Sequence, residues 1–461
     1  MVENEYLRRM VDRIIPRYVS EQTNAPIELG YRNAEIFSNG KTINGRGWAQ
    51  LHLGLREHVV VTVEVEDYFD AASILYSSAD LMLKLEGASR PTAVISTQTS
   101  TTDERCELKL VARSGTFELC RDRRIRLKSA ILHLVSFPAF VCLCENSPDF
   151  LFEEGGKHQR LGRIVLAHKE WLIEIQELPH TREIVKQLKS DGGRGITHVV
   201  KVDRCDGKSF PISALWRVIG DLHRFLSFAR GQWTSIFGPV GYDAGNALVY
   251  ESWGTLLSAP WQSGYAWLDV HHGECLAEAY SGFVTTLHNK LLGEAVSTAL
   301  YWYLRSNRGG DGAGIDSGLI LSQSALERLS VAILSSSGST IPNSAAEKIR
   351  AACLELGIPI KLPPHLKELQ KAKRADPKLS DAVAMIVCVR NELVHPKRRM
   401  AVKITPLIVP CWQLAQWYIE MFLLKLSGYN GRYSNRLKAK WVGEVESVPW
   451  ADEHRRSRKA T

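Results

Sequence analysis

The stretch DAVAMIVCVRNELVHP, residues 381–396, decides the C-terminal fold and carries the most informative residues of the chain. Its apolar residues recur at the spacing of one helix face, and this stripe consists of Val383, Ile386, Val387, Leu393 and Val394. The stripe position that lies seven residues after Val383 and four after Ile386 is occupied by Arg390. A guanidinium at such a position must pair with a carboxylate, reach water along its own stem, or face an interface that receives an anion.

His395 follows Arg390 by five positions, which in a continuous α-helix would place it roughly 140° around the helix axis. Pro396 changes this expectation, because the residue before a proline is driven out of the α region. The helix should therefore end near Val394, with His395 at its C-terminal end, where the chain turns back. Arg390 and His395 can then converge on one cleft.

Helical spacing extends outward from this stretch in both directions. The predicted helices span residues 275–305, 317–334, 344–356, 380–394 and 410–426. Ser344 and Glu347 form a capping box, and Gly357 supplies a left-handed C-terminal stop. A proline-containing connector, residues 357–373, joins two of the helices. We therefore expect an α-helical bundle over residues 285–440.

The first two hundred residues alternate with a period of two wherever they are apolar. The alternating stretches are residues 59–66, 107–110, 124–128 and 171–176. This pattern is typical of half-buried antiparallel strands, and the glycine-containing turns between them predict a sandwich or barrel-like domain. The expected fold class is α+β. In chain order we expect an N-terminal segment 1–24, a β-rich domain 25–240, a connecting region 241–284, the bundle 285–440 and a basic tail 441–461.

The composition favours a soluble protein with more than one domain. The chain has 461 residues, of which 45% are hydrophobic and 23% charged, and a formal net charge of +8. These values exclude collagen-like, low-complexity and wholly disordered proteins. Nine cysteines without a C-x-x-C pair are typical of a reduced, cytoplasmic protein. No secretory signal is expected, and the most apolar stretch, residues 130–144, is too short for a membrane helix.

Several familiar ligand sites are excluded by spacing. The stretch Gly207-Lys208-Ser209 lacks the glycine that a phosphate-binding loop requires five residues earlier, since that position is Val202. His271 and His272 are metal-ligand types, but adjacent side chains point in different directions and nothing nearby completes a set of four ligands. We therefore expect neither a metal ion nor a cofactor.

An arginine and a histidine five positions apart are weak evidence on their own, because this spacing occurs twice in the chain. Arg163 and His168 have it within a strand-like segment and without a following proline. The second occurrence has Asn391 directly after Arg390, a helix before it and Pro396 after the histidine. A basic run follows it, consisting of Lys397, Arg398 and Arg399.

Placed at the end of a bundle helix, Arg390-Asn391-x-x-x-His395 resembles the R-N/H/D-x(3–5)-H motif of HEPN ribonucleases. Similarity to the ApeA-like branch of that family extends over about residues 285–440 and is carried by Ser324–Leu329, Leu356–Pro359 and Leu426–Tyr433. Phe225–Trp233 is similar, less closely, to the end of the β-rich N-terminal domain of ApeA-type antiphage proteins. The resemblance implies a metal-independent endoribonuclease that acts in abortive infection, with a composite active site across a homodimer.

The residues agree with that chemistry. Metal-free cleavage of RNA needs a base for the 2′-OH proton, an acid for the 5′-oxygen and a cation for the charge on phosphorus. Pairing two chains about a two-fold axis doubles the available arginine and histidine. We assign Arg390 to phosphate stabilisation, His395 to proton transfer and Asn391 to orienting the histidine or the phosphate, with a 2′,3′-cyclic phosphate as product. Residues 371–400 include eight basic and three acidic side chains, and we expect Lys397, Arg398 and Arg399 to bind the RNA backbone.

Several alternatives stay open. Arg390 can instead be a structural residue that pairs with Glu327 or Glu294. The bundle can be a non-catalytic dimerisation or nucleotide-sensing scaffold, with the β-rich domain binding the ligand. A metal-dependent hydrolase that uses His271 and His272 would be abolished by chelators, whereas the HEPN mechanism would not. Transfer RNA and messenger RNA are both possible substrates, and a viral protein or ligand at the β-rich domain is a possible trigger by analogy of architecture.

Overall fold

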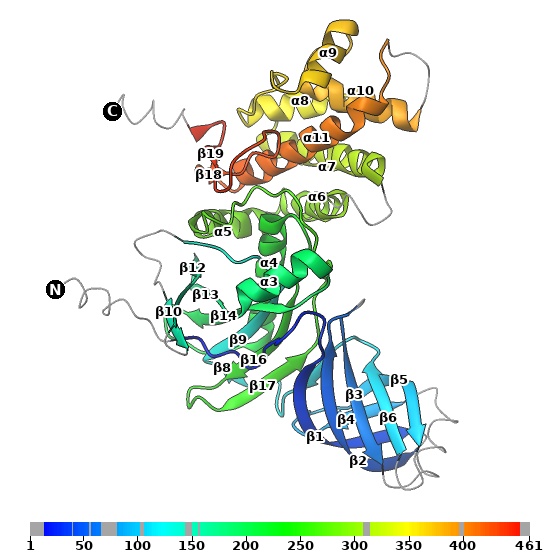
Figure 1. The fold of residues 1–461 in the computed structure, drawn as a ribbon, viewed down its shortest axis with the longest axis vertical. Helices are drawn as coiled ribbons and strands as arrows, with labels where there is room; N and C mark the ends of the chain where they lie inside the picture. Colours follow the sequence, from blue (N-terminus) through cyan, green and yellow to red (C-terminus); the bar gives the residue numbers. More distant parts are fainter. Residues whose placement is uncertain are drawn as a thin grey trace, which may run out of the picture. The chain divides into compact units, whose positions relative to one another are not determined.

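The protein consists of two compact units (Figure 1). The first comprises Met1–His223 and Thr234–Ser263, and the second comprises Arg224–Trp233 and Gly264–Thr461. Helix α4, Ile212–Arg230, is divided between them. The computed structural model describes residues 13–38, 40–54, 57–65, 81–101, 106–142, 150–154, 157–307, 314–395 and 401–451.

A closed antiparallel barrel begins the first unit, with the strand order β1-β2-β3-β6-β5-β4. Its strands are β1 Ile27–Ser38, β2 Lys41–His52, β3 His58–Val65, β4 Met82–Leu85, β5 Thr92–Thr101 and β6 Cys106–Ala112. Burial alternates strictly along β6, because successive side chains point into the barrel and out of it. The predicted barrel-like architecture is confirmed for this part, and the alternating stretches 59–66 and 107–110 fall on β3 and β6 as far as the described residues extend.

A seven-stranded antiparallel sheet follows in the first unit, in the order β12-β13-β14-β9-β16-β17-β7. Its strands are β7 Phe117–Leu119, β9 Ser129–Val135, β12 Arg163–His168, β13 Trp171–Glu177, β14 Ile196–Arg204, β16 Ile236–Tyr242 and β17 Leu248–Trp253. The unit also contains helix α3, Thr181–Asp191, and the short pairs β8 Arg126–Leu127 with β15 Phe210–Pro211 and β10 Phe150–Glu154 with β11 Lys157–Leu161. The expected domain boundary at residue 240 falls inside the β16–β17 hairpin, so the β-rich part extends further than expected.

One apolar core joins the barrel to the sheet, since Leu110 of β6 and Val199 of β14 belong to the same buried cluster. The segment before β1 is attached beside this core. The backbone N–H of Tyr18 donates to Nε2 of the buried His133 at 3.0 Å, and the Tyr18 hydroxyl donates to the carboxylate of Glu251. Part of the expected N-terminal segment 1–24 is therefore built into the first unit.

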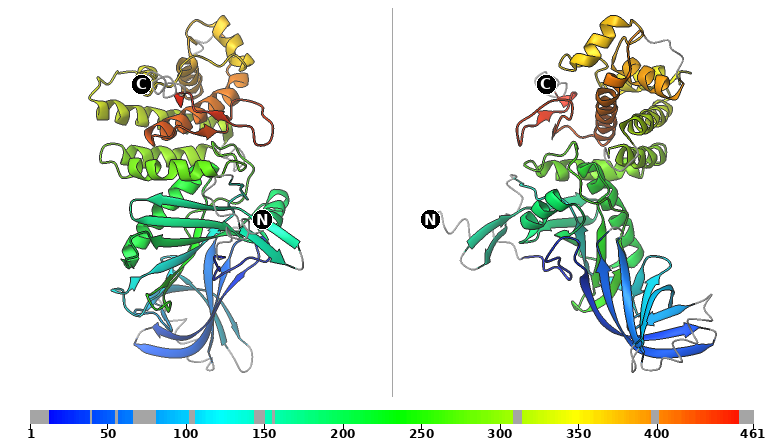
Figure 2. Two further views of the ribbon diagram at one scale, coloured as in Figure 1. Left: turned by 90° about the vertical axis from the view of Figure 1, so that its left-hand side faces the viewer. Right: turned by 45° about the vertical axis from the view of Figure 1, so that its right-hand side comes forward.

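The second unit is a helical bundle with a small C-terminal hairpin. Its helices are α5 Glu274–Leu287, α6 Gly293–Ser306, α7 Gly314–Ser337, α8 Ala345–Glu355, α9 Lys367–Ala375, α10 Ala382–Val394 and α11 Thr405–Leu426, and its strands are β18 Arg432–Tyr433 and β19 Glu446–Ser447. Helices α6, α7 and α11 lie side by side, as the left view of Figure 2 shows. The Ser344 hydroxyl caps α8 by accepting the Glu347 N–H, and Gly357 has a φ of 65° after this helix. Both punctuation signals are therefore confirmed.

Three helical predictions need correction. The segment 275–305 is two helices, because the Asn289 side chain accepts the N–H groups of Leu291 and Leu292 and so ends one helix before the next begins. Helix α9 begins inside the predicted connector 357–373 and ends after it. Helix α11 begins at Thr405 and contains Pro410 near its start, rather than beginning at that proline.

The sequence predicts a frayed basic tail from residue 441, and Trp441 and Val442 are each 86% exposed, but the described chain beyond them is partly packed against its unit. Strand β19 pairs with β18, and the buried Trp450 donates through Nε1 to the carbonyl oxygen of Tyr429 at 2.8 Å. Among the described residues, α11 is long and apolar enough to cross a membrane, but 78% of the relevant stretch is buried inside the structure. This burial is what the core helix of a soluble protein would show.

Candidate functional site

Helix α10 carries the predicted site, and it packs against α7, α8 and α11. Its N-cap is Asp381, whose carboxylate accepts the N–H of Ala384 at 2.7 Å and also pairs with Nε of Arg350 at 2.8 Å. The first half of the predicted apolar stripe is core, since Val383, Ile386 and Val387 are buried. The last turn is not, because Leu393 is only half-buried and Val394 is 38% exposed. The C-terminal end of the helix, where the predicted site residues lie, is therefore at the surface of its unit.

Arg390 lies where the buried and exposed halves of α10 meet. Its Nη1 donates to Oδ1 of Asn391 at 3.2 Å. Its Nε is buried and has no hydrogen-bond partner, and no ion pair to Arg390 occurs within the described ranges. A buried guanidinium nitrogen without a partner is costly, so this position is not explained by the internal packing of the unit.

The two carboxylates proposed as structural partners of Arg390 are engaged elsewhere. Glu327 pairs with Nζ of Lys348 at 2.8 Å, and Glu294 pairs with Nη2 of Arg328 at 2.6 Å. The structural ion pair that was the main alternative for Arg390 is therefore not formed with either residue.

His395 is the C-cap of α10, as the following proline predicted. Its backbone dihedral angles, φ −132° and ψ 71°, are not helical, and its N–H donates to the carbonyl oxygen of Asn391. The ring is exposed, and in the part of the chain that the structure describes it makes no hydrogen bond or ion pair. Arg390, Asn391 and His395 thus share one end of one helix, although no hydrogen bond joins Arg390 to His395 in the described chain. Lys397, Arg398 and Arg399 lie outside the described residues.

The chain that follows the motif returns to the end of α9. The N–H of Ala401 donates to Oδ2 of Asp376, which follows α9 directly, at 3.2 Å. The other oxygen of this buried carboxylate accepts the N–H of Lys378. Because Asp376 also acts electrostatically on the thiol of Cys388, which lies within α10, the C-terminal end of α9 lies near the middle of α10.

Helix α9 presents a basic surface that the sequence analysis did not assign to a helix. Only Leu369 and Ala372 are buried, and they attach α9 to α11. The cations of α9 form no ion pair with any described residue, and they are Lys367, Lys371, Lys373 and Arg374. We call these four residues the α9 cations. The buried residues Leu369 and Ala372 lie at helical spacing, but two apolar residues are too few for the sequence pattern alone to identify the helix.

The other occurrence of the arginine–histidine spacing is structural. Arg163 lies on β12, is 3% exposed, and pairs with the carboxylate of Glu174 on β13. His168 ends the same strand and also has an interaction partner. The same spacing therefore produces, in one place, an arginine that is ion-paired with a carboxylate on the neighbouring strand, and in the other an arginine at a helix end that has no ion pair in the described chain.

The adjacent histidines of the second unit fasten the C-terminal hairpin. Nδ1 of His271 lies 3.0 Å from a carboxylate oxygen of Asp269. His272 has Glu274 near Nδ1 and the carbonyl oxygen of Gly443 at 3.0 Å from Nε2. No group of three or more metal-ligating side chains occurs among the residues that the structure describes. These imidazoles are thus engaged with protein groups.

Comparisons with known proteins give similarity without an activity. Residues 289–447 match the family described as the YopA C-terminal domain, and residues 122–264 match the YopA central domain. A protein of Bacillus subtilis (strain 168), described as the SPbeta prophage-derived uncharacterized protein YopA, is 25% identical over 305 residues, which is 64% of this chain and 67% of the relative. No solved structure matches. The two ranges that match the YopA domain families include the whole of α10 and most of the seven-stranded sheet but not the barrel strands β1–β6.

Proposed function

We propose that the helical unit is a metal-independent endoribonuclease of the HEPN type. The observation that carries this proposal is Arg390, a half-buried guanidinium with an unpartnered Nε and no neutralising carboxylate in the described chain. Retaining such a charge costs stability unless an anion from outside the chain uses it. A planar guanidinium binds a phosphate group through two parallel hydrogen bonds, so the backbone of RNA is a suitable anion.

In this proposal the three residues at the end of α10 have separate tasks. Arg390 stabilises the charge that develops on the phosphorus, and the hydrogen bond from Nη1 to Asn391 orients the guanidinium. His395 transfers a proton, for which its exposed ring and the absence of an internal partner in the described residues are suitable. The 2′-OH attacks the phosphorus, and the product carries a 2′,3′-cyclic phosphate.

The proposed active site is completed by a second copy of the chain. One arginine and one histidine supply too few groups for a base, an acid and a cation. The last turn of α10 offers a surface for pairing, because Val394 is 38% exposed and Leu393 is only half-buried. A two-fold axis beside this turn would bring two copies of the motif together and would shield the unpaired Arg390 side chains from bulk water.

The α9 cations support RNA as the substrate class. Unpaired lysines and arginines on one helix attract a polyanion and release its condensed counterions. They lie on the element that precedes α10, and the chain after the motif returns to Asp376 at the end of that element. We propose that Lys397, Arg398 and Arg399 continue the same path for the RNA backbone, with transfer RNA as a possible substrate.

In the cell, we propose that cleavage serves abortive infection in an antiphage system, in the cytoplasm. The first unit would restrain or trigger the nuclease on meeting a viral protein or ligand. The similarity to a prophage-derived protein agrees with a role in conflict between a phage and its host. The runner-up function is a non-catalytic HEPN scaffold for dimerisation or for sensing a nucleotide.

Cleavage of total RNA in the presence of EDTA tests the proposal. We expect the wild-type protein to cut RNA under these conditions and both Arg390→Ala and His395→Ala to abolish cutting without changing the oligomeric state. His365→Ala and Arg305→Ala are matched controls of the same residue types, since His365 and Arg305 are exposed in the same unit and belong to neither the proposed active site nor the α9 cations. Both controls should retain the full rate.

Mixing the two inactive variants tests the composite site. If each cleft uses Arg390 and His395 from different subunits, then mixed dimers of Arg390→Ala and His395→Ala should recover part of the activity. EDTA-resistant cutting that survives both substitutions would overturn the catalytic assignment. An inactive wild type whose toxicity to the host does not depend on His395 would favour the non-catalytic scaffold.

A further inference from the structure

The first unit contains two neighbouring cavities that meet at one place. The first, of about 470 Å³, lies between β1 of the barrel and β17 of the sheet. The second, of about 600 Å³, continues along the barrel past Asn33 and Glu35. Both are lined by Glu86, Gly87 and Arg121. Their volumes are those of small-molecule sites, and such sites are common where two substructures meet.

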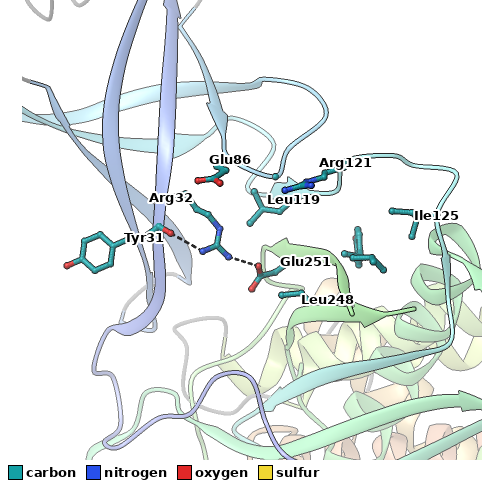
Figure 3. A pocket seen from close by; sticks show the side chains of 11 residues that line it. Tyr31, Arg32, Glu86, Leu119, Arg121, Ile125, Leu248 and Glu251 are labelled. Carbon is teal, nitrogen blue, oxygen red and sulfur yellow. Dashed lines mark hydrogen bonds and ion pairs between the residues drawn. The ribbon is translucent and has the colours of Figure 1, made fainter. Parts of the chain in front are cut away.

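Arg32 is held in a fixed position in the wall of the first cavity (Figure 3). Its Nη2 pairs with Oε2 of Glu251 at 3.0 Å, and its Nη1 donates to the carbonyl oxygen of Tyr31 at 2.9 Å. The guanidinium also lies over the ring of Trp253, 5.6 Å from its centroid. Because Arg17 approaches the same carboxylate at 3.8 Å, two guanidiniums share one negative charge. The group therefore keeps one positive charge and a preorganised donor that faces the cavity.

Arg121 lies across the cavity from Arg32, whereas Glu86 lies beside Arg32, and neither side chain forms an ion pair among the described residues. Arg121 is exposed and makes no hydrogen bond or ion pair among the described residues. Glu86 accepts a hydrogen bond from Nδ2 of Asn33 at 3.0 Å, which orients its carboxylate. Although both side chains reach the same space in Figure 3, no ion pair joins them. With this arrangement, Arg121 can bind an anionic group of a ligand while Glu86 accepts hydrogen bonds from donors of the same ligand.

The rest of the cavity lining is apolar. Leu119, Ile125 and Leu248 supply side chains to the wall, and Leu248 is 43% exposed at the rim. A single exposed leucine needs no explanation. Here, however, it borders a cavity that also contains two guanidiniums and an oriented carboxylate, so a ligand that is partly apolar and partly anionic would use the whole lining.

We propose that this cavity binds a nucleotide. The phosphates would lie between Arg32 and Arg121, because planar guanidiniums match phosphate oxygens. The carboxylate of Glu86 would accept hydrogen bonds from the ribose hydroxyls, a role that carboxylates have in other nucleotide sites. The base would lie against the apolar wall at Leu119 and Leu248. The inference does not rest on the proposed ribonuclease, since every residue in it belongs to the first unit.

The test is the binding of ATP, GTP, AMP and inorganic phosphate to the full-length protein, measured by titration calorimetry. We expect at least one nucleotide to bind, and Arg121→Ala to weaken that binding by about tenfold or more, the loss expected for a hydrogen bond to a charged group. Arg124→Ala is the matched control, since Arg124 lies three residues away, is 92% exposed and lines neither cavity. It should bind within about twofold of the wild type.

Two further variants make the test specific for a nucleotide. Glu86→Gln should weaken nucleotide binding but not the binding of inorganic phosphate, because phosphate has no hydroxyl group for Glu86. Leu248→Glu changes the opposite wall of the cavity and should also weaken nucleotide binding. Because Leu248 is exposed, this substitution does not place a charge in the core. The proposal is overturned if none of the nucleotides binds, if Arg121→Ala binds as tightly as Arg124→Ala, or if inorganic phosphate binds as tightly as the nucleotides.

Discussion

Replacing Arg390 by methionine separates the structural from the functional interpretation of this residue. The buried Nε has no hydrogen-bond partner, and a buried polar group in that condition costs about 1–3 kcal/mol. The substitution also removes the hydrogen bond to Asn391, which is exposed and 3.2 Å long and stabilises by at most about 1 kcal/mol. We therefore expect Arg390→Met to leave the free energy of unfolding unchanged or to raise it by up to about 2 kcal/mol.

The same substitution should lower the rate of RNA cleavage by about 10²–10³, the usual loss when one group that stabilises transition-state charge is removed. Lost activity with retained or increased stability is the combination expected of a residue kept for function. Urea unfolding of the full-length protein measures the stability, and hydrogen exchange of the α10 and α7 amides reports on the helical unit separately.

Arg436→Met is the matched control for a buried arginine that does have a partner. Arg436 and Glu420 are fully buried and form an ion pair, and Tyr303 donates to the same carboxylate at 2.6 Å. Removing the arginine leaves Glu420 buried without a counter-charge, so we expect a loss of about 3–5 kcal/mol. Destabilisation by Arg390→Met of more than about 1 kcal/mol, or an unchanged cleavage rate, would refute the functional interpretation.

Two further predictions concern acid and salt. Burial lowers the pKa of His133 from 6.5 to about 4. Between these two pH values the unfolded chain binds a proton at His133 and the folded chain does not. The free energy of unfolding therefore falls as the pH falls through this window. Relative to His133→Gln, the wild type should lose roughly 3 kcal/mol between pH 7 and pH 4, measured by hydrogen exchange of β9. The comparison with the variant cancels the opposite contribution of Glu57, whose pKa burial raises to about 7. Replacing Lys371 and Arg374 by alanine should reduce the slope of log affinity against log salt by about 1.4 for single-stranded RNA. Fluorescence anisotropy measures this slope. The control Lys348→Ala should leave the slope unchanged, because Lys348 is already paired with a carboxylate.

Local periodicity located strands β3, β6, β8 and β13 and the bundle helices other than α9, because burial on one face imposes a period of two on a strand and 3.6 on a helix. The predictions failed where the interaction is not periodic. The break between α5 and α6 depends on the Asn289 side chain and on Gly293, where a Cβ would meet the carbonyl oxygen of Leu287 at 2.3 Å. Helix α9 buries only Leu369 and Ala372, too few apolar residues to identify it from its pattern. The closure of the barrel depends on the pairing of β1 with β4, which is distant in the sequence.

The candidate site was predictable in its position but not in its electrostatics. The proline rule located the end of α10 at Val394, and His395 takes the C-cap position that follows from it. The state of Arg390 could not be derived in the same way, since Glu327 and Glu294 were reasonable partners on neighbouring helices. Which cation each of these carboxylates selects depends on the packing of α6, α7 and α8 against one another.

Three other cations of the helical unit that are buried or partly buried are paired with carboxylates, and Arg390 differs from them in this respect. Arg436 is fully buried and pairs with Glu420, and the partly buried Arg350 and Lys348 also pair with carboxylates. Each of these cations follows the rule that charge removed from water is neutralised within the chain. Arg390 departs from this rule in the described chain, on the same helix end as an exposed histidine and beside a helix whose cations are also unpaired. Because local exceptions to such rules concentrate at functional sites, the anion that Arg390 lacks is better sought in a ligand than in the fold.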